Sequence, residues 1–160
     1  MRNPFPCLWF DGKAEEAAGF YTSLLPGSSV DKVWRSPADT PSGPAGMVLT
    51  VDFTLNGQQF QGLNGGPDFR FNEAVSLQIY CETQDEIDYY WSKLTAGGDP
   101  TAQVCGWLKD KFGLSWQITP EILLELIQDP DEQKSQRVMK AMMQMKKIDI
   151  EDLKKAAEAQ

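Results

Sequence analysis

An internal repeat constrains the fold of this chain more than any other feature. Helical patterns of similar residues begin near Lys13 and near Gln84, and both stop at a glycine. A shift of 70 positions aligns Glu16 with Glu86, Phe20 with Tyr90, Leu24 with Leu94, and Gly27 with Gly97. Repeats at this spacing indicate a duplicated supersecondary unit, so the chain is expected to hold two copies of one module.

The first copy alternates strand and helix signals. A short apolar run at 6–10 ends at a turn, and residues 13–25 place apolar side chains at helical spacing until Pro26-Gly27 stops them. An edge-like strand at 29–36 and a loop follow. Asn56-Gly57 is a strong hairpin signal, so 47–55 and 58–63 are predicted to pair.

The second copy follows the same order. We expect a strand at 75–82, a helix at 84–96, and a hairpin whose strands are 107–109 and 114–119. The sequence therefore predicts an α+β fold of paired βαβββ modules, the first at 1–66 and the second at 67–120. Residues 121–160 are predicted to form a helical C-terminal extension of the same domain.

The extension reads as three helices, at 121–128, 131–145 and 150–159. Its middle helix carries an apolar stripe of Val138, Met142 and Met145. Thioether side chains adapt to irregular contacts, so the methionine-rich surface of Met139, Met142, Met143 and Met145 is a candidate partner groove. Packing within the core or across a dimer is the more ordinary interpretation.

Composition restricts the chemistry. The chain of 160 residues has no histidine, which excludes Ser-His-Asp and Cys-His devices and histidine-ligated metal sites. The three cysteines have no paired spacing, so reduced thiols are expected.

A net charge of -8 argues against a nucleic-acid partner. No apolar run is long enough for a signal peptide or membrane span, so a cytoplasmic protein without membrane association is expected.

Several spaced motifs resemble one known family. They are Phe10-Asp11-Gly12 followed by 14–17 and Phe20-Tyr21, then the segments 71–74, 105–113 and 116–118. From about Pro6 to the end, the chain resembles the PhnB-like family, also labelled 3-demethylubiquinone-9 3-methyltransferase-like, of the vicinal-oxygen-chelate superfamily. The resemblance implies a glyoxalase/bleomycin resistance-like fold, a ligand cavity within curved sheets, and a homodimer.

The resemblance also locates the positions that hold metal in metal-dependent relatives. They fall near Pro6 or Cys7, near Leu63 or Asn64, at Ser76 and at Gln117, and none is His, Asp or Glu. Divalent ions prefer more charge than these side chains supply, so we predict no metal and no cofactor. S-adenosylmethionine enzymes of the ubiquinone pathway use a glycine-rich turn from a strand into a helix. This sequence shows no such turn, because Gly62, Gly65 and Gly66 follow a hairpin strand and lead to a proline.

Strand parity selects the candidate ligand-binding residues. If Leu8 and Phe10 meet the first helix, Cys7 and Trp9 face the other side of the sheet. The same argument places Ser76, Gln78, Tyr80, Ser115 and Gln117 on the open side of the second module. Trp107 stands beside Gly106 and can stack on a ligand, although a buried aromatic residue is the more ordinary interpretation. The predicted ligand-binding set is Cys7, Trp9, Asn64, Gln78, Tyr80, Trp107 and Gln117.

These observations lead to one preferred function and two alternatives. The preferred function is metal-free binding of a small aromatic or amphipathic molecule in a cavity of the curved sheet. The first alternative is a lyase, isomerase or transferase of the same superfamily, working with an added divalent ion. The second is an assembly protein whose methionine-rich helices bind another protein. A homodimer is expected in each case, because a single module leaves sheet edges exposed.

Overall fold

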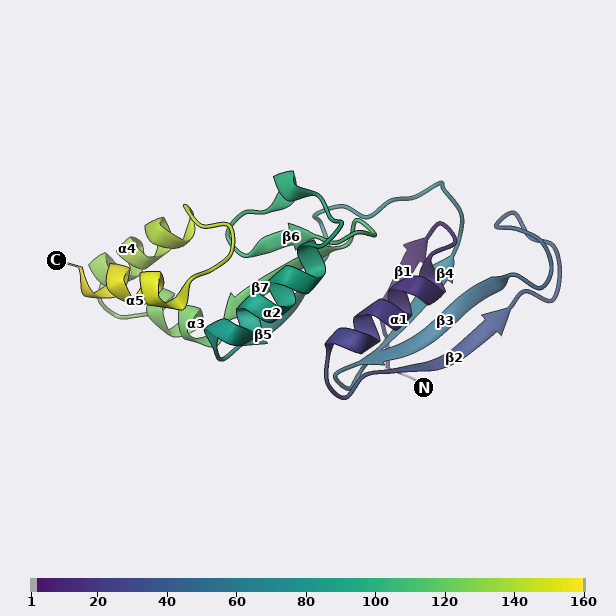
Figure 1. Ribbon diagram of the computed structural model, residues 1–160, viewed down its shortest axis with the longest axis horizontal. Helices are drawn as coiled ribbons and strands as arrows, with labels where there is room; N and C mark the ends of the chain where they lie inside the picture. The colour runs from purple at the N-terminus through teal and green to yellow at the C-terminus, as the bar shows by residue number, and fades with distance from the viewer. Residues whose placement is uncertain (1–2, 160) are drawn as a thin grey trace. The chain divides into compact units, whose positions relative to one another are not determined.

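The computed structural model describes residues 3–159 and divides into two compact units, residues 1–71 and 72–160 (Figure 1). Each unit is an α+β structure with one small sheet and a helix on one face of that sheet.

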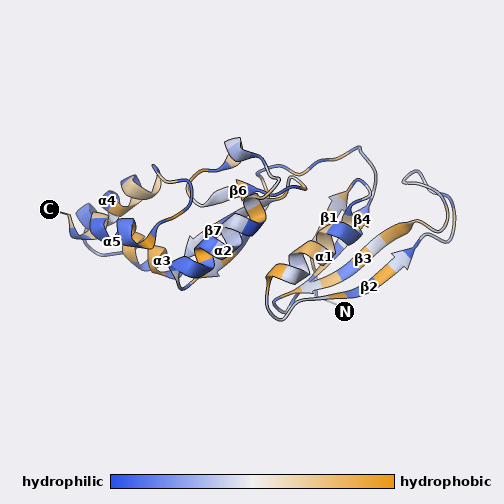
Figure 2. Ribbon diagram, in the orientation of Figure 1, coloured by the Kyte–Doolittle hydropathy of each residue, from blue (hydrophilic) through white to orange (hydrophobic). Residues whose placement is uncertain are grey.

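The first unit contains a four-stranded sheet in the order β1-β4-β3-β2, with β1 parallel to β4 and the other pairs antiparallel. Its helix covers one face, where apolar side chains of the sheet meet the buried Tyr21 and three alanines of the helix. Figure 2 shows the hydrophobic residues that run along β3. The elements are β1 (Cys7–Phe10), α1 (Ala14–Leu24), β2 (Ser29–Arg35), β3 (Val48–Leu55) and β4 (Gln58–Asn64).

The predicted hairpin between β3 and β4 is confirmed. Asn56 has φ 45° and Gly57 has φ 84°, so both central residues adopt the left-handed conformation that a two-residue hairpin of the primed type requires. Asparagine and glycine tolerate this conformation better than other residues. The turn chemistry therefore sets the register of Leu55 opposite Gln58.

The second unit repeats the plan with one strand fewer. Its described residues form a three-stranded sheet in the order β5-β7-β6, with β5 parallel to β7, as β1 is to β4 in the first unit. Segment 98–104 occupies the outer edge of β6, where Gly98 lies against the Lys109 carbonyl and Val104 bridges to Trp107. The elements are β5 (Ser76–Cys81), α2 (Gln84–Thr95), the 3-10 helix η1 (Pro100–Ala102), β6 (Trp107–Lys109) and β7 (Ser115–Pro120).

Local polar contacts fix the ends of these elements. α2 begins with a capping box, in which the Thr83 hydroxyl accepts from the Glu86 N–H at 3.2 Å and the Glu86 carboxylate accepts from the Thr83 N–H at 3.3 Å. The turn before β7 is organised by the buried Asp110 carboxylate. It accepts from two backbone N–H groups of that turn and from Trp116 Nε1 at 2.9 Å, so both Asp110 and Trp116 are structural.

The C-terminal extension forms α3 (Glu121–Ile127), α4 (Glu132–Met142) and α5 (Ile150–Glu158). The predicted stripe packs inside this extension: Val138 is buried, and Met142 and Met145 pack against its core of Leu123, Ile148, Leu153 and Ala157. Core packing thus accounts for the stripe. Met139 and Met143 remain exposed.

Candidate functional site

The open face of the second sheet brings four of the predicted residues together. Gln78, Gln117 and Trp107 are register partners across the three strands, so their side chains form one row on the face opposite α2. Tyr80 stands on the same face and is 45% exposed. Gln117 Nε2 donates to Ser76 Oγ at 2.9 Å, which links this row to the neighbouring row that contains Ser76 and Ser115.

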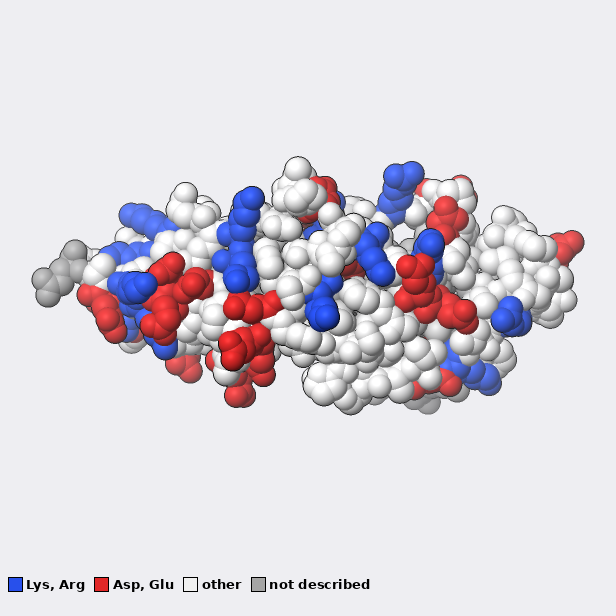
Figure 3. Space-filling model, in the orientation of Figure 1, with Lys and Arg blue, Asp and Glu red and all other residues white. Residues whose placement is uncertain are grey.

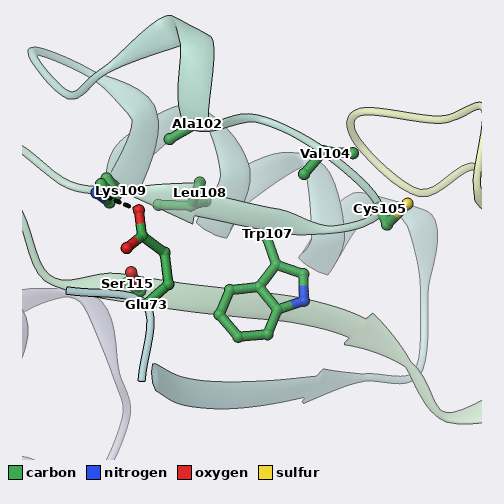
Figure 4. Close-up of a pocket in the computed structure, with 8 residues that line it drawn as sticks. All are labelled: Glu73, Ala102, Val104, Cys105, Trp107, Leu108, Lys109 and Ser115. Atoms are coloured by element: carbon green, nitrogen blue, oxygen red, sulfur yellow. Dashed lines mark ion pairs between the residues drawn. The ribbon is translucent and has the colours of Figure 1, made fainter. Parts of the chain in front are cut away.

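A cavity of about 480 Å³ opens at the β6 side of this face (Figure 4). Strands β6 and β7 supply part of its lining, and segment 98–105 supplies the opposite wall. Figure 4 shows the ion pair between Glu73 and Lys109 at one end of the cavity and Cys105 toward the other. The lining residues are Glu73, Ala102, Val104, Cys105, Trp107, Leu108, Lys109 and Ser115.

This lining suits a small organic molecule. Trp107 is half-buried and offers its indole to the cavity, and three aliphatic residues supply the remaining apolar surface. The polar groups are few: one ion pair, one hydroxyl and one thiol. Largely apolar cavities with a few polar groups are the usual form of small-molecule sites.

The first unit places Cys7 and Trp9 on the open face of its own sheet, as predicted from strand parity. Cys7 is exposed, and its thiol lies 3.8 Å from Gln61 Oε1. Trp9 donates from Nε1 to the Gly66 carbonyl at 2.8 Å and meets Phe69 edge to face. The Trp9 ring therefore holds the segment that follows β4.

Asn64 lies on the opposite side of the sheet from Cys7 and Trp9. β4 extends through residue 64, one residue further than predicted, and pairs Asn64 with the buried Phe10. Asn64 Oδ1 accepts from the Ala14 N–H at 2.9 Å, and Nδ2 donates to the Val48 carbonyl at 2.9 Å. Asn64 thus caps the start of α1, and we leave it out of the candidate site.

The glycines near β4 have packing roles. Gly62 lies beneath α1, where a Cβ would come within 3.0 Å of Ala14 Cβ. Gly65 lies against the Trp9 ring, where a Cβ would approach within 2.3 Å. Close packing explains both residues, which matches the expectation that this cluster is no nucleotide-binding turn.

The thiols of Cys81 and Cys7 have raised pKa values and are therefore less acidic than usual. Burial raises the pKa of Cys81 to about 11, with smaller contributions from the charges of Glu86 and Glu121. Partial desolvation also raises the pKa of Cys7. Because the thiolate is the reactive form, neither sulfur is activated as a nucleophile at neutral pH.

The residues at the metal positions of related proteins do not fit a divalent ion here. The amide of Asn64 is committed to α1 and β3, and Gln117 bonds to Ser76. No group of three His, Cys, Asp or Glu side chains within residues 3–159 is arranged to hold a metal ion. We therefore derive no chemistry through a metal.

The charged surface is mixed on the face seen in Figure 3, where basic and acidic side chains lie side by side over α5. Ion pairs of Lys154 with Glu151 and of Lys155 with Asp152 account for part of this pattern. No helix among the described residues is long and apolar enough to cross a membrane.

Most of the cavity lining was not predicted from the sequence: of its eight residues, only Trp107 and Ser115 were placed on this face. Glu73, Ala102 and Val104 lie outside regular strands, so no periodicity pointed to them. Lys109 could have been found, because it lies two residues after Trp107 on the same strand and therefore on the same face. Ser115 was placed on this face by parity, and the structure agrees.

Comparisons with known proteins agree with this architecture. The family model of 3-demethylubiquinone-9 3-methyltransferase matches residues 3–119. The PhnB protein of Bacillus cereus is 39% identical, with 74% of this chain and 99% of that chain covered and a TM-score of 0.63. Protein PA1353 of Pseudomonas aeruginosa shares the fold at 18% identity, 76% and 98% coverage, and a TM-score of 0.59. No protein of curated function matches the chain.

The two related units define an α+β protein with the fold of the solved PhnB structure. The chain belongs to the 3-demethylubiquinone-9 3-methyltransferase family, which includes PhnB-like proteins. The family match stops at residue 119, so the expectation that the resemblance reaches the end of the chain was wrong. Helices α3 to α5 lie beyond the matched region.

Proposed function

We propose that this protein binds a small aromatic or amphipathic molecule, without a metal, in the cavity beside β6. The observation that carries the proposal is the cavity itself, with a volume of about 480 Å³ and an indole and aliphatic side chains in its lining. A volume of this size falls within the range of ligand pockets in proteins.

A thermal-shift screen with aromatic compounds tests this proposal. A ligand present at one hundred times its Kd stabilises the native state by about 2.7 kcal/mol. For a protein of this size, that free energy raises Tm by roughly 5 to 10 °C. Replacing Trp107 with alanine should remove the shift.

The matched control is Tyr89→Ala, which removes an exposed aromatic residue of α2 in the same unit. This variant should keep the ligand-induced shift. If no compound stabilises the native protein, or if Trp107→Ala responds as fully as the native chain, the cavity is not the binding site.

We also propose that two copies of the chain form a homodimer. The edge strand β2 supports this proposal, because all seven of its residues are exposed and they include Val30, Val33 and Trp34. An exposed apolar edge strand readily pairs with another chain. Light scattering should give twice 17.9 kDa for the native chain and a smaller mass for Trp34→Glu. A native mass of one chain would reject the dimer.

A further inference from the structure

The cavity contains a buried hydroxyl that has no partner. Ser115 is 1% exposed, and its Oγ is the one buried side-chain nitrogen or oxygen among residues 3–159 that lacks a hydrogen-bond partner in the protein. Buried polar groups are nearly always satisfied, and the exceptions call for an explanation. Because Ser115 lines the cavity, a ligand atom can supply the missing hydrogen bond.

A positive charge stands next to this hydroxyl. Lys109 on β6 is the register partner of Ser115 on β7, so the two side chains project from neighbouring positions of one face. Both residues line the cavity. An ammonium group and a hydroxyl at adjacent positions can together donate hydrogen bonds to one anionic group.

Lys109 pairs with the carboxylate of Glu73, and a ligand carboxylate can take the place of that side chain. Glu73 lies in the turn before β5, and its side chain is 65% exposed, whereas that of Lys109 is 24% exposed. The hydrogen bond from Lys109 lowers the pKa of Glu73, so the group that meets the ammonium at neutral pH is a carboxylate. Because Glu73 is the exposed member of the pair, another carboxylate can replace it at small cost.

The rest of the lining selects the body of the ligand. Trp107 faces the cavity, while Ala102, Val104 and Leu108 complete an apolar surface without further charge. An aromatic ring gains both apolar burial and ring contact with the indole.

We infer that the cavity takes an aromatic carboxylate: its ring lies against Trp107, and its carboxylate accepts from Ser115 Oγ and from Lys109 in place of Glu73. This inference rests on the proposed function and specifies its ligand class. A cationic ligand would have to pair with the exposed Glu73 and would leave Lys109 without a partner.

Isothermal titration calorimetry with three matched compounds tests the inference. The probes are 3-phenylpropionate, its neutral amide 3-phenylpropionamide, and the cation 3-phenylpropylamine. The acid should bind at least tenfold more tightly than the amide, and the amine should bind most weakly, because charge-assisted hydrogen bonds are about twice as strong as neutral ones.

Three variants separate the roles of the polar residues. Lys109→Met should weaken binding of the acid about tenfold and leave the amide unchanged. Ser115→Ala should weaken the acid severalfold without lowering Tm, because it removes an unpartnered buried hydroxyl. Glu73→Gln should tighten binding of the acid, since the competing carboxylate is gone. Lys111→Met, in the neighbouring turn, is the matched control and should change nothing.

The outcomes distinguish this inference from the proposed function. If the amide or the amine binds as tightly as the acid, the inference is wrong and the cavity still binds ligands. Weaker binding of the acid to Glu73→Gln would also overturn the inference, because it would mean that Glu73 holds the ligand. If none of the three probes binds while the thermal-shift screen finds a ligand whose effect Trp107→Ala removes, the inference fails and the proposed function stands.

Discussion

At the scale of single residues, Asn64 differs most from its predicted role. The resemblance to metal-dependent relatives placed it at the site, just past the end of the predicted strand, but β4 continues through it, and each added residue reverses the face. Trp9, Gln78 and Gln117 kept their predicted faces, because they lie inside regular strands whose parity follows from buried neighbours. Parity is therefore predictable within a strand and uncertain at its end.

Replacement of Asn64 by alanine should destabilise the fold and leave ligand binding intact. The change removes two hydrogen bonds of a buried amide and leaves the Ala14 N–H and the Val48 carbonyl unsatisfied. We expect a loss of about 2 to 4 kcal/mol in the free energy of unfolding, measured by urea denaturation. The exposed Gln58→Ala should cost no more than about 0.5 kcal/mol. Equal costs for both variants would contradict the structural role of Asn64.

The buried thiol of Cys81 makes stability depend on pH in the alkaline range. Burial raises its pKa from 9.0 to about 11, so the folded state retains a proton that the unfolded state loses. The stabilisation is complete below pH 9 and disappears as pH rises through about 11. Its size is up to about 3 kcal/mol at ~1.4 kcal/mol per pKa unit.

Urea denaturation at several pH values measures this effect. The native chain should lose more stability than Cys81→Ala between pH 8.5 and 10.5, because the variant lacks the titrating group. Parallel pH profiles for the two proteins would show that Cys81 does not titrate differently on folding.

At the scale of elements, the C-terminal extension holds one wall of the cavity. The Cys105 N–H donates to the Met145 carbonyl and the Gly106 N–H donates to the Lys146 carbonyl, both at 2.8 Å. The Gln84 side chain of α2 also bonds both to the Ile148 carbonyl and to the Ile150 N–H. The backbone of 105–106 is therefore fixed by residues outside the family match, which periodicity could not predict.

Gly106→Ala should disturb this junction. Gly106 has φ 82°, and a Cβ there would lie 2.8 Å from the Ile118 carbonyl oxygen and 3.2 Å from Ile148 Cγ1. We expect a loss of about 2 kcal/mol or more in the free energy of unfolding. Gly19→Ala in α1 is the control, and it should change the free energy of unfolding in the opposite direction. A Cβ at this position meets nothing within 4 Å, so the variant should be more stable by up to about 1 kcal/mol. A neutral Gly106→Ala would contradict the tight junction.

At the scale of the whole molecule, the repeat predicted the order of strands and helices, because each module is built from local signals. The three strands located in the second copy correspond to β5, β6 and β7, but the fourth strand of a βαβββ module is missing within the described residues, since segment 98–104 lies along β6 without forming a regular strand. The cavity depends on that irregular segment for Ala102 and Val104. Thus the face of the site was predictable from parity, whereas its outer wall was not.

An NMR titration shows directly whether ligands bind in the cavity beside β6. Backbone amide signals of the native chain would be followed as 3-phenylpropionate is added. Binding in this cavity should give the largest shifts at residues 104–109 and 115–117, together with the indole N–H of Trp107. Shifts centred instead on Cys7 and Trp9, with no change at Trp107 or Ser115, would contradict it.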